Sequence, residues 1–401
     1  MGKKEIIESI LERAKQALNK PATYGEDIDV EALLREKPAE ISIDTRKISE
    51  LGLDLSEKSS SALYLQIDSL IKSYKKITPE VEIMSIEEAV DNKWDEIKDY
   101  FWRLIDPATD KYVAYTALRG IGGFYVRIKR NSRVQMPIQA CMMSRGGAQL
   151  LHNIIVLEEN SEAVILSGCL AAIEKLNLHV GVSEIYMEPG SKLTSVMIHS
   201  WTNVSHVRPR TKILMKDNTT LIDYYINMSD TKTLQSYPII ISEGSNNRIM
   251  SASIILGSGD SYYDLGAGVV LYGDDSSAQL ISRIVARDNS KVVNRLSIES
   301  RGRGNKAYIE CNGLLLSKNS SITTIPELDA KNPESDLYHE ASIGRIRDDE
   351  IDYLISKGLS YREAIALLIR GFVETDIEIP NKILDKYIKN VLDMFASKSS
   401  A

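Results

Sequence analysis

Cysteine is scarce in this sequence, which contains only Cys141, Cys169 and Cys311 among its 401 residues. The three cannot all pair with one another, and no two of them form a Cys-x-x-Cys motif, which excludes a structural zinc ribbon. On residue type alone, buried structural thiols are the expected state of Cys141 and Cys169, because free cysteine packs as a small apolar residue.

Basic charge and long apolar runs are also lacking. The chain has 49 Lys and Arg against 56 Asp and Glu, a formal net charge of −7, whereas a nucleic-acid-binding protein normally carries a basic excess. No apolar run approaches the roughly 18 residues of a membrane span, and residues 1–8 are charged where a secretory signal would be apolar. We therefore expect a cytoplasmic protein that binds neither nucleic acid nor a membrane.

The common catalytic signatures are missing as well. The sequence contains no GxSxG motif, no HExxH motif and no EF-hand loop. Residues 190–194, Gly-Ser-Lys-Leu-Thr, have the composition of a phosphate-binding loop but not its Gly-Lys-Ser/Thr order or its upstream glycine. We expect that the chain does not bind ATP through a P-loop and is not an enzyme in its own right.

Short runs of β-branched and aromatic residues fill the middle of the chain. Runs of about five residues recur about every 12 to 17 residues, and clusters of Gly, Asn, Asp and Ser separate them without a helical pattern. The pattern predicts a mainly β body, and it does not choose among a sandwich, a barrel and a solenoid. A solenoid would explain the length as one unit, because each coil buries its apolar side on the next.

Helical patterns flank the β body on both sides. We expect an N-terminal helical region with a linker over residues 1–109, the β body over residues 110–325, and a C-terminal helical domain over residues 326–401. In the third part, Ser360 opens a capping box with the Glu three residues later. Gly371 is expected to end the helix that follows.

Three residues near the C-terminal end carry side chains of the types that bind iron and other transition metals: Cys311, His339 and Glu340. The cysteine and the histidine are 28 residues apart, and a fold that returns on itself could bring them together. Neighbours in a strand face opposite sides, so His339 and Glu340 would converge only on an irregular turn. The ordinary alternative is that His339 is a surface or hydrogen-bonded histidine.

The residues after Cys311 are Asn312 and Gly313, a pair that is typical of a turn. We therefore expect Cys311 at the end of a strand, where it is more exposed than in the middle. A thiol in that position would reach the thiolate state after only a modest change from its ordinary pKa of about 8.5.

Several longer stretches resemble one known family, in the same order along the chain. They are Ser59–Asp68, Tyr100–Trp102, Phe124–Val126, Val134–Gln139, Leu166–Cys169 and, as the most specific, the run from Pro326 to Phe372 with His-Glu-Ala-Ser-Ile-Gly-Arg at 339–345. Together they resemble the SufB/SufD family of iron–sulfur cluster assembly scaffolds.

The resemblance implies a right-handed parallel β-helix flanked by helical parts. It implies a SufC-type ABC ATPase as a partner, held by the C-terminal helices, and a sulfur donor system as another. Two β-helix subunits would pair through their C-terminal coils, either as a homodimer or as a heterodimer with a SufD/SufB-type subunit. ATP would act only through the partner subunit, and a reduced flavin is a further candidate cofactor.

The resemblance also assigns roles to residues. The family's B-type subunit carries a cysteine and a His-Glu pair at this place, and the D-type lacks the cysteine. Cys311, His339 and Glu340 match the B-type set, which implies that they hold a transient iron–sulfur cluster. A shell of mixed thiolate, nitrogen and oxygen ligands should hold a cluster less firmly than four thiolates, which suits a site that hands the cluster on.

A second set of residues matches the sulfur-transfer path that is proposed for the family. Cys169 matches a cysteine early in the β-helix, and Trp201 matches the tryptophan of the path. His199 stands where B-type members have a glutamine two residues before that tryptophan.

Two other functions stay open. A D-like structural or regulatory subunit would support the ATPase without holding a cluster, and Cys311 counts against it. A β-solenoid carbohydrate enzyme would need convergent carboxylates on one face of a strand, and the sequence does not display them.

Overall fold

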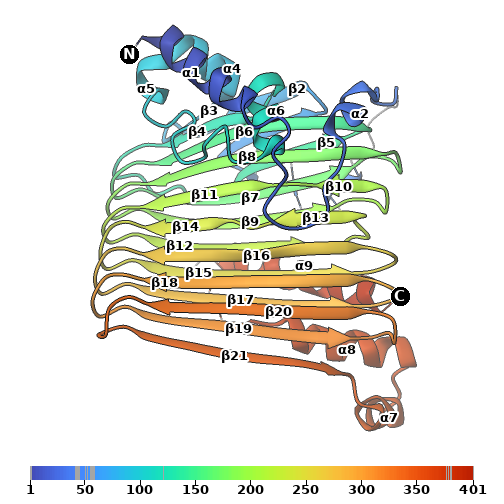
Figure 1. The fold of residues 1–401 in the computed structure, drawn as a ribbon. Helices are drawn as coiled ribbons and strands as arrows, with labels where there is room; N and C mark the ends of the chain where they lie inside the picture. Colours follow the sequence, from blue (N-terminus) through green and yellow to red (C-terminus); the bar gives the residue numbers. More distant parts are fainter. Residues whose placement is uncertain are drawn as a thin grey trace.

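Two long sheets wind together into a β-helix in the computed structural model of the chain (Figure 1). The structure describes residues 2–40, 46–49, 51, 53–54, 59–120, 122–375, 377, 379 and 382–400. From β5 onward the strands alternate between the two sheets, so that each coil contributes to both. The coils pair in parallel, whereas β1–β2 and β3–β4 are antiparallel.

Sheet A contains, in spatial order, β2 (Leu70–Lys76), β1 (Ala62–Ile67), β5 (Ile138–Ser144), β7 (Glu162–Ala171), β9 (Lys192–Ser200), β12 (Thr220–Asn227), β15 (Arg248–Gly257), β17 (Ser277–Ala286), β19 (Lys306–Leu315) and β21 (Asp336–Arg345). Sheet B contains, in chain order, β3 (Val81–Ser85), β4 (Phe124–Ile128), β6 (Gly147–Leu157), β8 (Asn177–Met187), β10 (Ser205–Val207), β11 (Arg210–Met215), β13 (Thr233–Ser236), β14 (Ile239–Ser242), β16 (Tyr262–Leu271), β18 (Lys291–Ser300) and β20 (Ser321–Ala330).

The length of one coil follows from the strand register. Thr220 of β12 pairs with Arg248 of β15, which pairs with Ser277 of β17, so one coil takes 28 or 29 residues. Side chains at alternate positions of each strand point inward, where they form one core between the sheets. Each coil therefore covers the apolar inner residues of the one before it.

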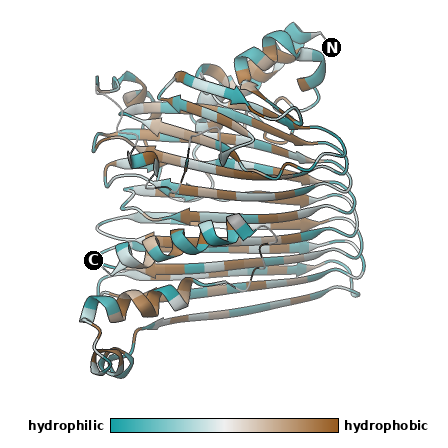
Figure 2. Ribbon diagram, turned by 180° about the vertical axis from the view of Figure 1, so that it is seen from behind, coloured by the Kyte–Doolittle hydropathy of each residue, from teal (hydrophilic) through white to brown (hydrophobic). Residues whose placement is uncertain are grey.

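The described helices are α1 (Lys3–Lys15), α2 (Val30–Arg35), α3 (Arg46–Ser49), α4 (Ile86–Asn92), α5 (Trp94–Ile97), α6 (Lys111–Arg119), α7 (Asp348–Ser356), α8 (Tyr361–Val373) and α9 (Lys382–Ser399). Helices α1 and α4 to α6 gather at the N-terminal end, while α8 and α9 lie across the outer face of sheet A (Figure 2). Ile369 of α8 and Phe395 of α9 pack there against outward residues of the sheet such as Ile254. None of these helices is long and apolar enough to cross a membrane.

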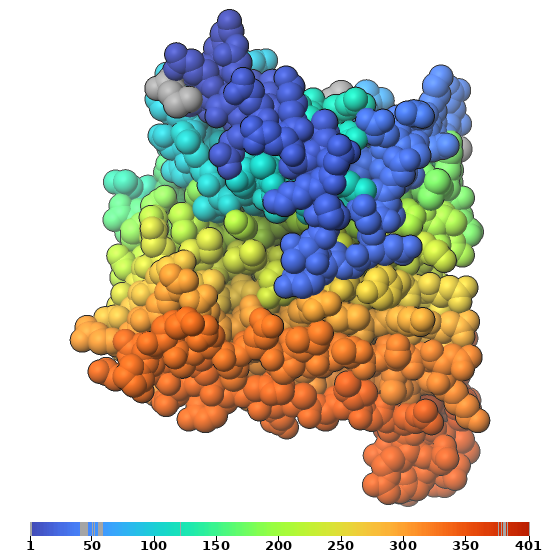
Figure 3. Space-filling model, viewed as in Figure 1, coloured from blue at the N-terminus to red at the C-terminus, as the bar shows by residue number. Residues whose placement is uncertain are grey.

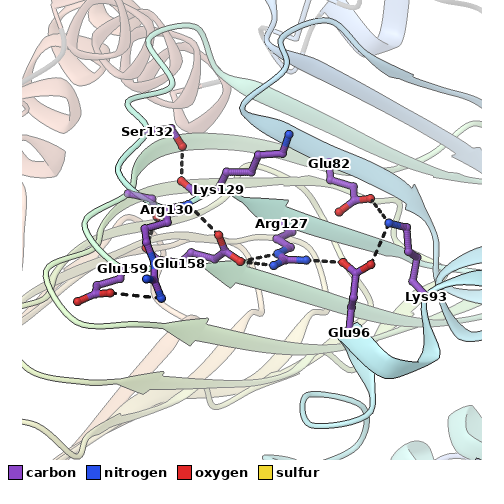
Figure 4. Close-up of polar contacts among 10 residues, drawn as sticks. Glu82, Lys93, Glu96, Arg127, Lys129, Arg130, Ser132, Glu158 and Glu159 are labelled. Atoms are coloured by element: carbon purple, nitrogen blue, oxygen red, sulfur yellow. Dashed lines mark hydrogen bonds and ion pairs between the residues drawn. The ribbon is translucent and has the colours of Figure 1, made fainter.

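An ion-pair network fastens α5 to the first coils (Figure 4). Arg127 of β4 bonds with Glu96 of α5 on one side and with Glu158 on the other. Lys93, next to α5, contacts Glu82 at 3.1 Å and Glu96 at 3.0 Å. These side chains are partly exposed, so each pair adds little stability alone and the network mainly fixes the position of α5.

A segment near the N-terminus crosses the outer face of sheet B (Figure 3). The Tyr24 ring lies under the Arg295 guanidinium at 4.3 Å, and Arg295 also pairs with Asp264 at 2.7 Å. Arg208 donates to the Glu26 carbonyl at 3.0 Å. This segment therefore ties the N-terminal region to coils far along the chain.

The mainly β body, the helical ends and the parallel β-helix are confirmed. The prediction that helices return after Pro326 is wrong, because Pro326 lies within β20 and the strands continue to Arg345. Proline is tolerated there because β20 is an edge strand that pairs only with β18. The strands also begin earlier than predicted, with β1 to β3 inside the region 1–109.

The predicted capping box of α8 is confirmed, since Ser360 Oγ accepts a hydrogen bond from the Glu363 amide at 3.3 Å. The prediction that Gly371 ends this helix is wrong, because α8 continues to Val373. The apolar side of α8 packs on sheet A, and this packing outweighs the low helix propensity of one glycine.

Candidate metal site at the C-terminal end of the β-helix

Cys311 lies in the middle of β19, and its side chain points into the β-helix. It belongs to the inner core together with Ile309 and is 1% exposed. The predictions of a strand end and of an exposed thiol are therefore wrong. The inner face of the coil, and not the local sequence, decides the surroundings of this cysteine.

Asn312 and Gly313 continue β19 instead of forming a turn. The Asn312 side chain points outward, where it donates to Glu310 Oε1 at 2.8 Å and accepts from Ser342 Oγ at 2.7 Å. Gly313 lies where a Cβ atom would be 3.0 Å from Ile322 Cδ1. The asparagine thus bonds across strands, and the glycine gives room to the core.

Burial raises the pKa of the Cys311 thiol to about 12, Glu310 adds to the rise, and Arg283 opposes it. The modest shift that the sequence suggested is wrong, and the thiol is neutral in the folded chain. Its recorded polar contact is Asn294 Nδ2, 3.8 Å from the sulfur. A metal ion that binds here must displace the proton from this thiol.

His339 lies on β21 and faces the same side of sheet A as Cys311. In the register, Ile309 pairs with His339 and Cys311 pairs with Ala341. His339 is therefore two positions from direct pairing with the cysteine, and positions two apart share a face. The imidazole is exposed because β21 is the last strand and no further coil covers it.

Another pair in the chain has the same offset. Cys169 of β7 and Met197 of β9 are also 28 residues apart, and Cys169 pairs in register with His199. The Cys169 sulfur lies 3.9 Å from the Met197 sulfur. A side chain at this offset can therefore reach a cysteine on the neighbouring coil, and the spacing of Cys311 and His339 has a structural meaning.

Glu340 points to the opposite face of β21. It pairs in register with Glu310, and its Oε2 accepts a hydrogen bond from the Tyr308 hydroxyl at 2.9 Å. The convergence of His339 and Glu340 on an irregular turn is not found, because β21 is a regular strand. Within the described part of the chain, no group of three or more His, Cys, Asp or Glu residues is placed to hold a metal ion.

The last coil leaves both sheets open at one end (Figure 3). Strand β21 pairs only with β19, and β20 only with β18. Tyr338, Ile343 and Leu328 are large apolar residues exposed on these two strands. Exposed edge strands offer unpaired backbone groups to another chain, so the candidate ligands lie beside a surface suited to pairing.

The structure brings Cys169, His199 and Trp201 together inside the β-helix. The Trp201 ring lies 5.9 Å from the His199 ring, and His199 Nδ1 hydrogen-bonds the Tyr225 hydroxyl at 2.8 Å. Burial raises the pKa of Cys169 well above its usual value and lowers that of His199. Both groups are therefore neutral at physiological pH.

Sequence reasoning missed several polar residues beside these three. His179, whose pKa burial lowers to about 3, lies 4.8 Å from the Trp201 ring. Asp223, whose pKa burial raises to about 6, and Tyr225 line the same interior cavity of about 120 Å³. The coil length of 28 or 29 residues is the signal that could have found them, because it aligns the inner positions of successive strands.

Helices α7 and α8 expose large apolar residues away from the β-helix: Tyr353, Ile355, Tyr361 and Leu367. No described segment covers them. Apolar groups gathered in this way on a helical surface mark a site of contact with another protein.

Comparison with known proteins agrees with these features. The family model described as SUF system FeS cluster assembly, SufBD core domain, matches residues 140–372. An iron–sulfur cluster assembly SufBD family protein of Methanothermobacter thermautotrophicus (strain Delta H) is 37% identical, over 97% of this chain and 99% of its own length.

Two further relatives show how far the similarity extends. A SufBD family protein of Archaeoglobus fulgidus is 35% identical, over 88% of this chain and 96% of its own length. The iron–sulfur cluster assembly protein SufB of Bacillus subtilis is 24% identical, over 84% of this chain and 74% of its own length.

Proposed function

This chain belongs to the SufBD family of SUF-system proteins for iron–sulfur cluster assembly, and we propose that it is the scaffold subunit on which a nascent cluster forms. The observation that carries the proposal is the placement of Cys311 and His339 on one inner face of the last two coils, next to an open edge. A thiolate and an imidazole are suitable ligands for iron. The cluster is cargo that the site makes and releases.

The site needs a second subunit to be complete. One chain offers two inner-face ligands, while Glu340 points outward and no described group of three ligands is formed. A partner subunit that pairs along the edges of β20 and β21 would bring its own ligands to the same place. That partner is a second copy of this chain or a SufD/SufB-type subunit.

The exposed apolar residues of α7 and α8 support binding of a SufC-type ABC ATPase through the C-terminal helices. ATP would act only through that subunit. Strand β21 ends at Arg345 and α7 begins at Asp348, so only two residues link them. A pull on α7 would therefore act directly on β21, and release of β21 would uncover Cys311 for iron and sulfur.

The interior group of Cys169, His199 and Trp201 supports a role as the sulfur-transfer path, because all three are buried and in contact with one another or with the same cavity. The sulfur donor system would feed this path. The reduced flavin stays a prediction of the family resemblance alone.

Anaerobic reconstitution tests the scaffold function. Iron, sulfide and a reductant should give thiolate-to-iron absorption with the intact chain, alone or with its partner subunit, and Cys311→Ala should abolish it. Cys141→Ala is the matched control, since Cys141 is also a fully buried thiol but lies on the outer side of sheet A. An unchanged spectrum with Cys311→Ala would contradict the proposal.

A D-like subunit that holds no cluster is the second candidate. It is favoured by the buried, neutral state of Cys311 and by the outward position of Glu340. Stable binding of the ATPase without any cluster, under every anaerobic condition and with either partner subunit, would support this alternative.

A further inference from the structure

A column of sulfur and hydroxyl side chains runs along the inner face of sheet A. In the register, Met197 pairs with Tyr225, Tyr225 with Ser253, Ser253 with Ser282, and Ser282 with Cys311. Neighbouring strands lie about 4.8 Å apart. The column therefore continues from coil to coil until it reaches the candidate metal ligand.

Three polar atoms along this column have no hydrogen-bond partner. They are Ser253 Oγ, Ser282 Oγ and Asn294 Oδ1. Ser282 and Asn294 are fully buried, and Asn294 Nδ2 lies 3.8 Å from the Cys311 sulfur. Buried polar groups in folded proteins nearly always have a partner, so these atoms indicate space that a small polar molecule uses.

The interior cavity meets the column at its N-terminal part. It has a volume of about 120 Å³, and Cys169, Tyr225 and Ser253 are among its lining residues. Ser282 and Cys311 lie one and two coils beyond Ser253. Cys169 is 1% exposed, so a loop of another protein has no access to it in the folded chain, and only a molecule of a few atoms fits the space.

The electrical character of the cavity decides which molecule fits. No lysine or arginine is among its lining residues. The titratable groups that face it are Cys169 from β7, His179 from β8, His199 from β9, and Asp223 and Tyr225 from β12.

Burial keeps the thiol, the phenol and both imidazoles neutral, because it raises the pKa values of the first two and lowers those of the last two. Asp223 is the one group in this set that becomes charged near neutral pH, and its charge is negative. An anion without a cationic partner is strongly disfavoured in such surroundings.

We propose that this column carries sulfur as uncharged hydrogen sulfide, and not as hydrosulfide or a persulfide anion, by way of Ser253 and Ser282 to Cys311. The inference rests on the proposed scaffold function and names the form of its sulfur substrate. The two hydroxyls and the Asn294 amide are the polar groups that hydrogen sulfide contacts on the way. The transit makes and breaks no bond and moves no electron.

Diffraction from sulfide-soaked crystals tests the proposal without any activity. Crystals of the full chain are soaked anaerobically with sodium sulfide on the acid and on the alkaline side of neutrality, and sulfur is located by its anomalous scattering. We expect a sulfur peak beside Ser253 or Ser282 on the acid side, where hydrogen sulfide keeps both protons, and its loss on the alkaline side. Water alone at both conditions, or a stronger peak on the alkaline side, overturns the proposal.

The Asp223→Asn variant separates the two titrations. Its side chain cannot become charged, so a peak that still disappears on the alkaline side reports the ionisation of the sulfide itself. A peak that persists on the alkaline side in this variant shows that the carboxylate alone excluded the anion, and it overturns the claim that the column takes only the uncharged form.

Blocking the column supplies a kinetic test. Ser282→Leu fills the inner position next to Cys311, and we expect it to slow cluster formation from free sulfide by about tenfold or more, with ferrous ion binding unchanged. Ser277→Leu is the control on the same strand, because Ser277 faces outward. Ser282→Ala removes only the hydroxyl and serves if the leucine variant does not fold.

The outcomes separate the two claims. A sulfur peak in the column of a chain that never forms a cluster contradicts the scaffold function and leaves the column intact. A cluster that forms at the same rate in Ser282→Leu and Ser277→Leu contradicts the column and leaves the scaffold function intact.

Discussion

Cys311 and His339 lie on adjacent strands of one sheet, two positions away from direct pairing, and both face the inside of the β-helix. The cysteine is buried under the last coil, whereas the histidine belongs to that coil and is exposed. Iron can therefore meet the imidazole first and the thiol only after β21 moves. This order makes the edge strand the element that controls the site.

Alkaline pH should destabilise the chain through its buried thiols. Burial raises the pKa of Cys141 from about 9 to about 12. The unfolded chain loses this proton near pH 9 and the folded chain only near pH 12, so its contribution of about 4 kcal/mol is complete below pH 9 and is lost between the two values. Urea unfolding of Cys141→Ala should show a weaker fall of stability above pH 9 than the parent chain shows. Equal slopes would contradict this prediction.

Glu184 should be essential for the attachment of the N-terminal region. Its buried carboxylate accepts hydrogen bonds from the amides of Trp102 and Leu104 at 2.9 and 2.6 Å and contacts His152 Nε2 at 2.8 Å. In Glu184→Gln, an amide group would face these donors, and we expect a loss of about 3 kcal/mol in the free energy of unfolding. Glu243→Gln, at an exposed ion pair, should change it by less than about 1 kcal/mol. Similar losses in the two variants would disprove this assignment.

The coil repeat explains which features could be predicted from the sequence. The alternation of apolar residues predicts the strands, and the opposite faces of His339 and Glu340 follow from strand geometry alone. The spacing of 28 between Cys311 and His339 also contains the answer, since it is one coil less the offset that keeps both on the inner face.

Other features depend on neighbours about 29 residues away, and local patterns do not contain them. Asn312 and Gly313 have the composition of a turn, but the coils on either side supply the asparagine's partner and the space that the glycine fills. Pro326 reads as a strand breaker, yet it lies on an edge where one side of the backbone needs no partner. The polar inner column is invisible until the register is known.

The exposed apolar residues of α7 and α8 should form the contact with the ATPase subunit. Leu367→Ser and Tyr361→Ser replace side chains that are 52% and 64% exposed, so the free energy of unfolding should change by less than about 1 kcal/mol. Loss of an apolar anchor in an interface typically costs about 2 kcal/mol or more, and co-purification with the ATPase should fall accordingly. Tyr272→Ser, which removes an exposed ring from the β-helix, should leave binding intact. Full binding by the helix variants would place the contact elsewhere.

The open edge should be the surface on which two β-helices pair. Ile343 is exposed on β21, and Ile343→Lys would place a charge on the edge, a common means of preventing strand pairing. Sedimentation analysis should show dimers, with this chain or with its SufD/SufB-type partner, for the parent and monomers for the variant. Leu176→Lys, at a similarly exposed leucine before β8, is the control and should remain dimeric. A dimeric Ile343→Lys protein would exclude this edge as the interface.

The offset between Cys311 and His339 can be tested by moving the imidazole. In the double variant His339→Ala, Ala341→His, the ring takes the position directly paired with Cys311 on the same inner face. Cobalt(II) should then still give thiolate absorption, because a directly paired side chain lies about 5 Å from the cysteine. His339→Ala alone should weaken cobalt binding, while Glu340→Gln should leave binding by the single chain unchanged, since Glu340 faces outward. Strong loss in Glu340→Gln, with no loss in His339→Ala, would show that β21 turns over before the metal binds and that its outer face supplies the ligand.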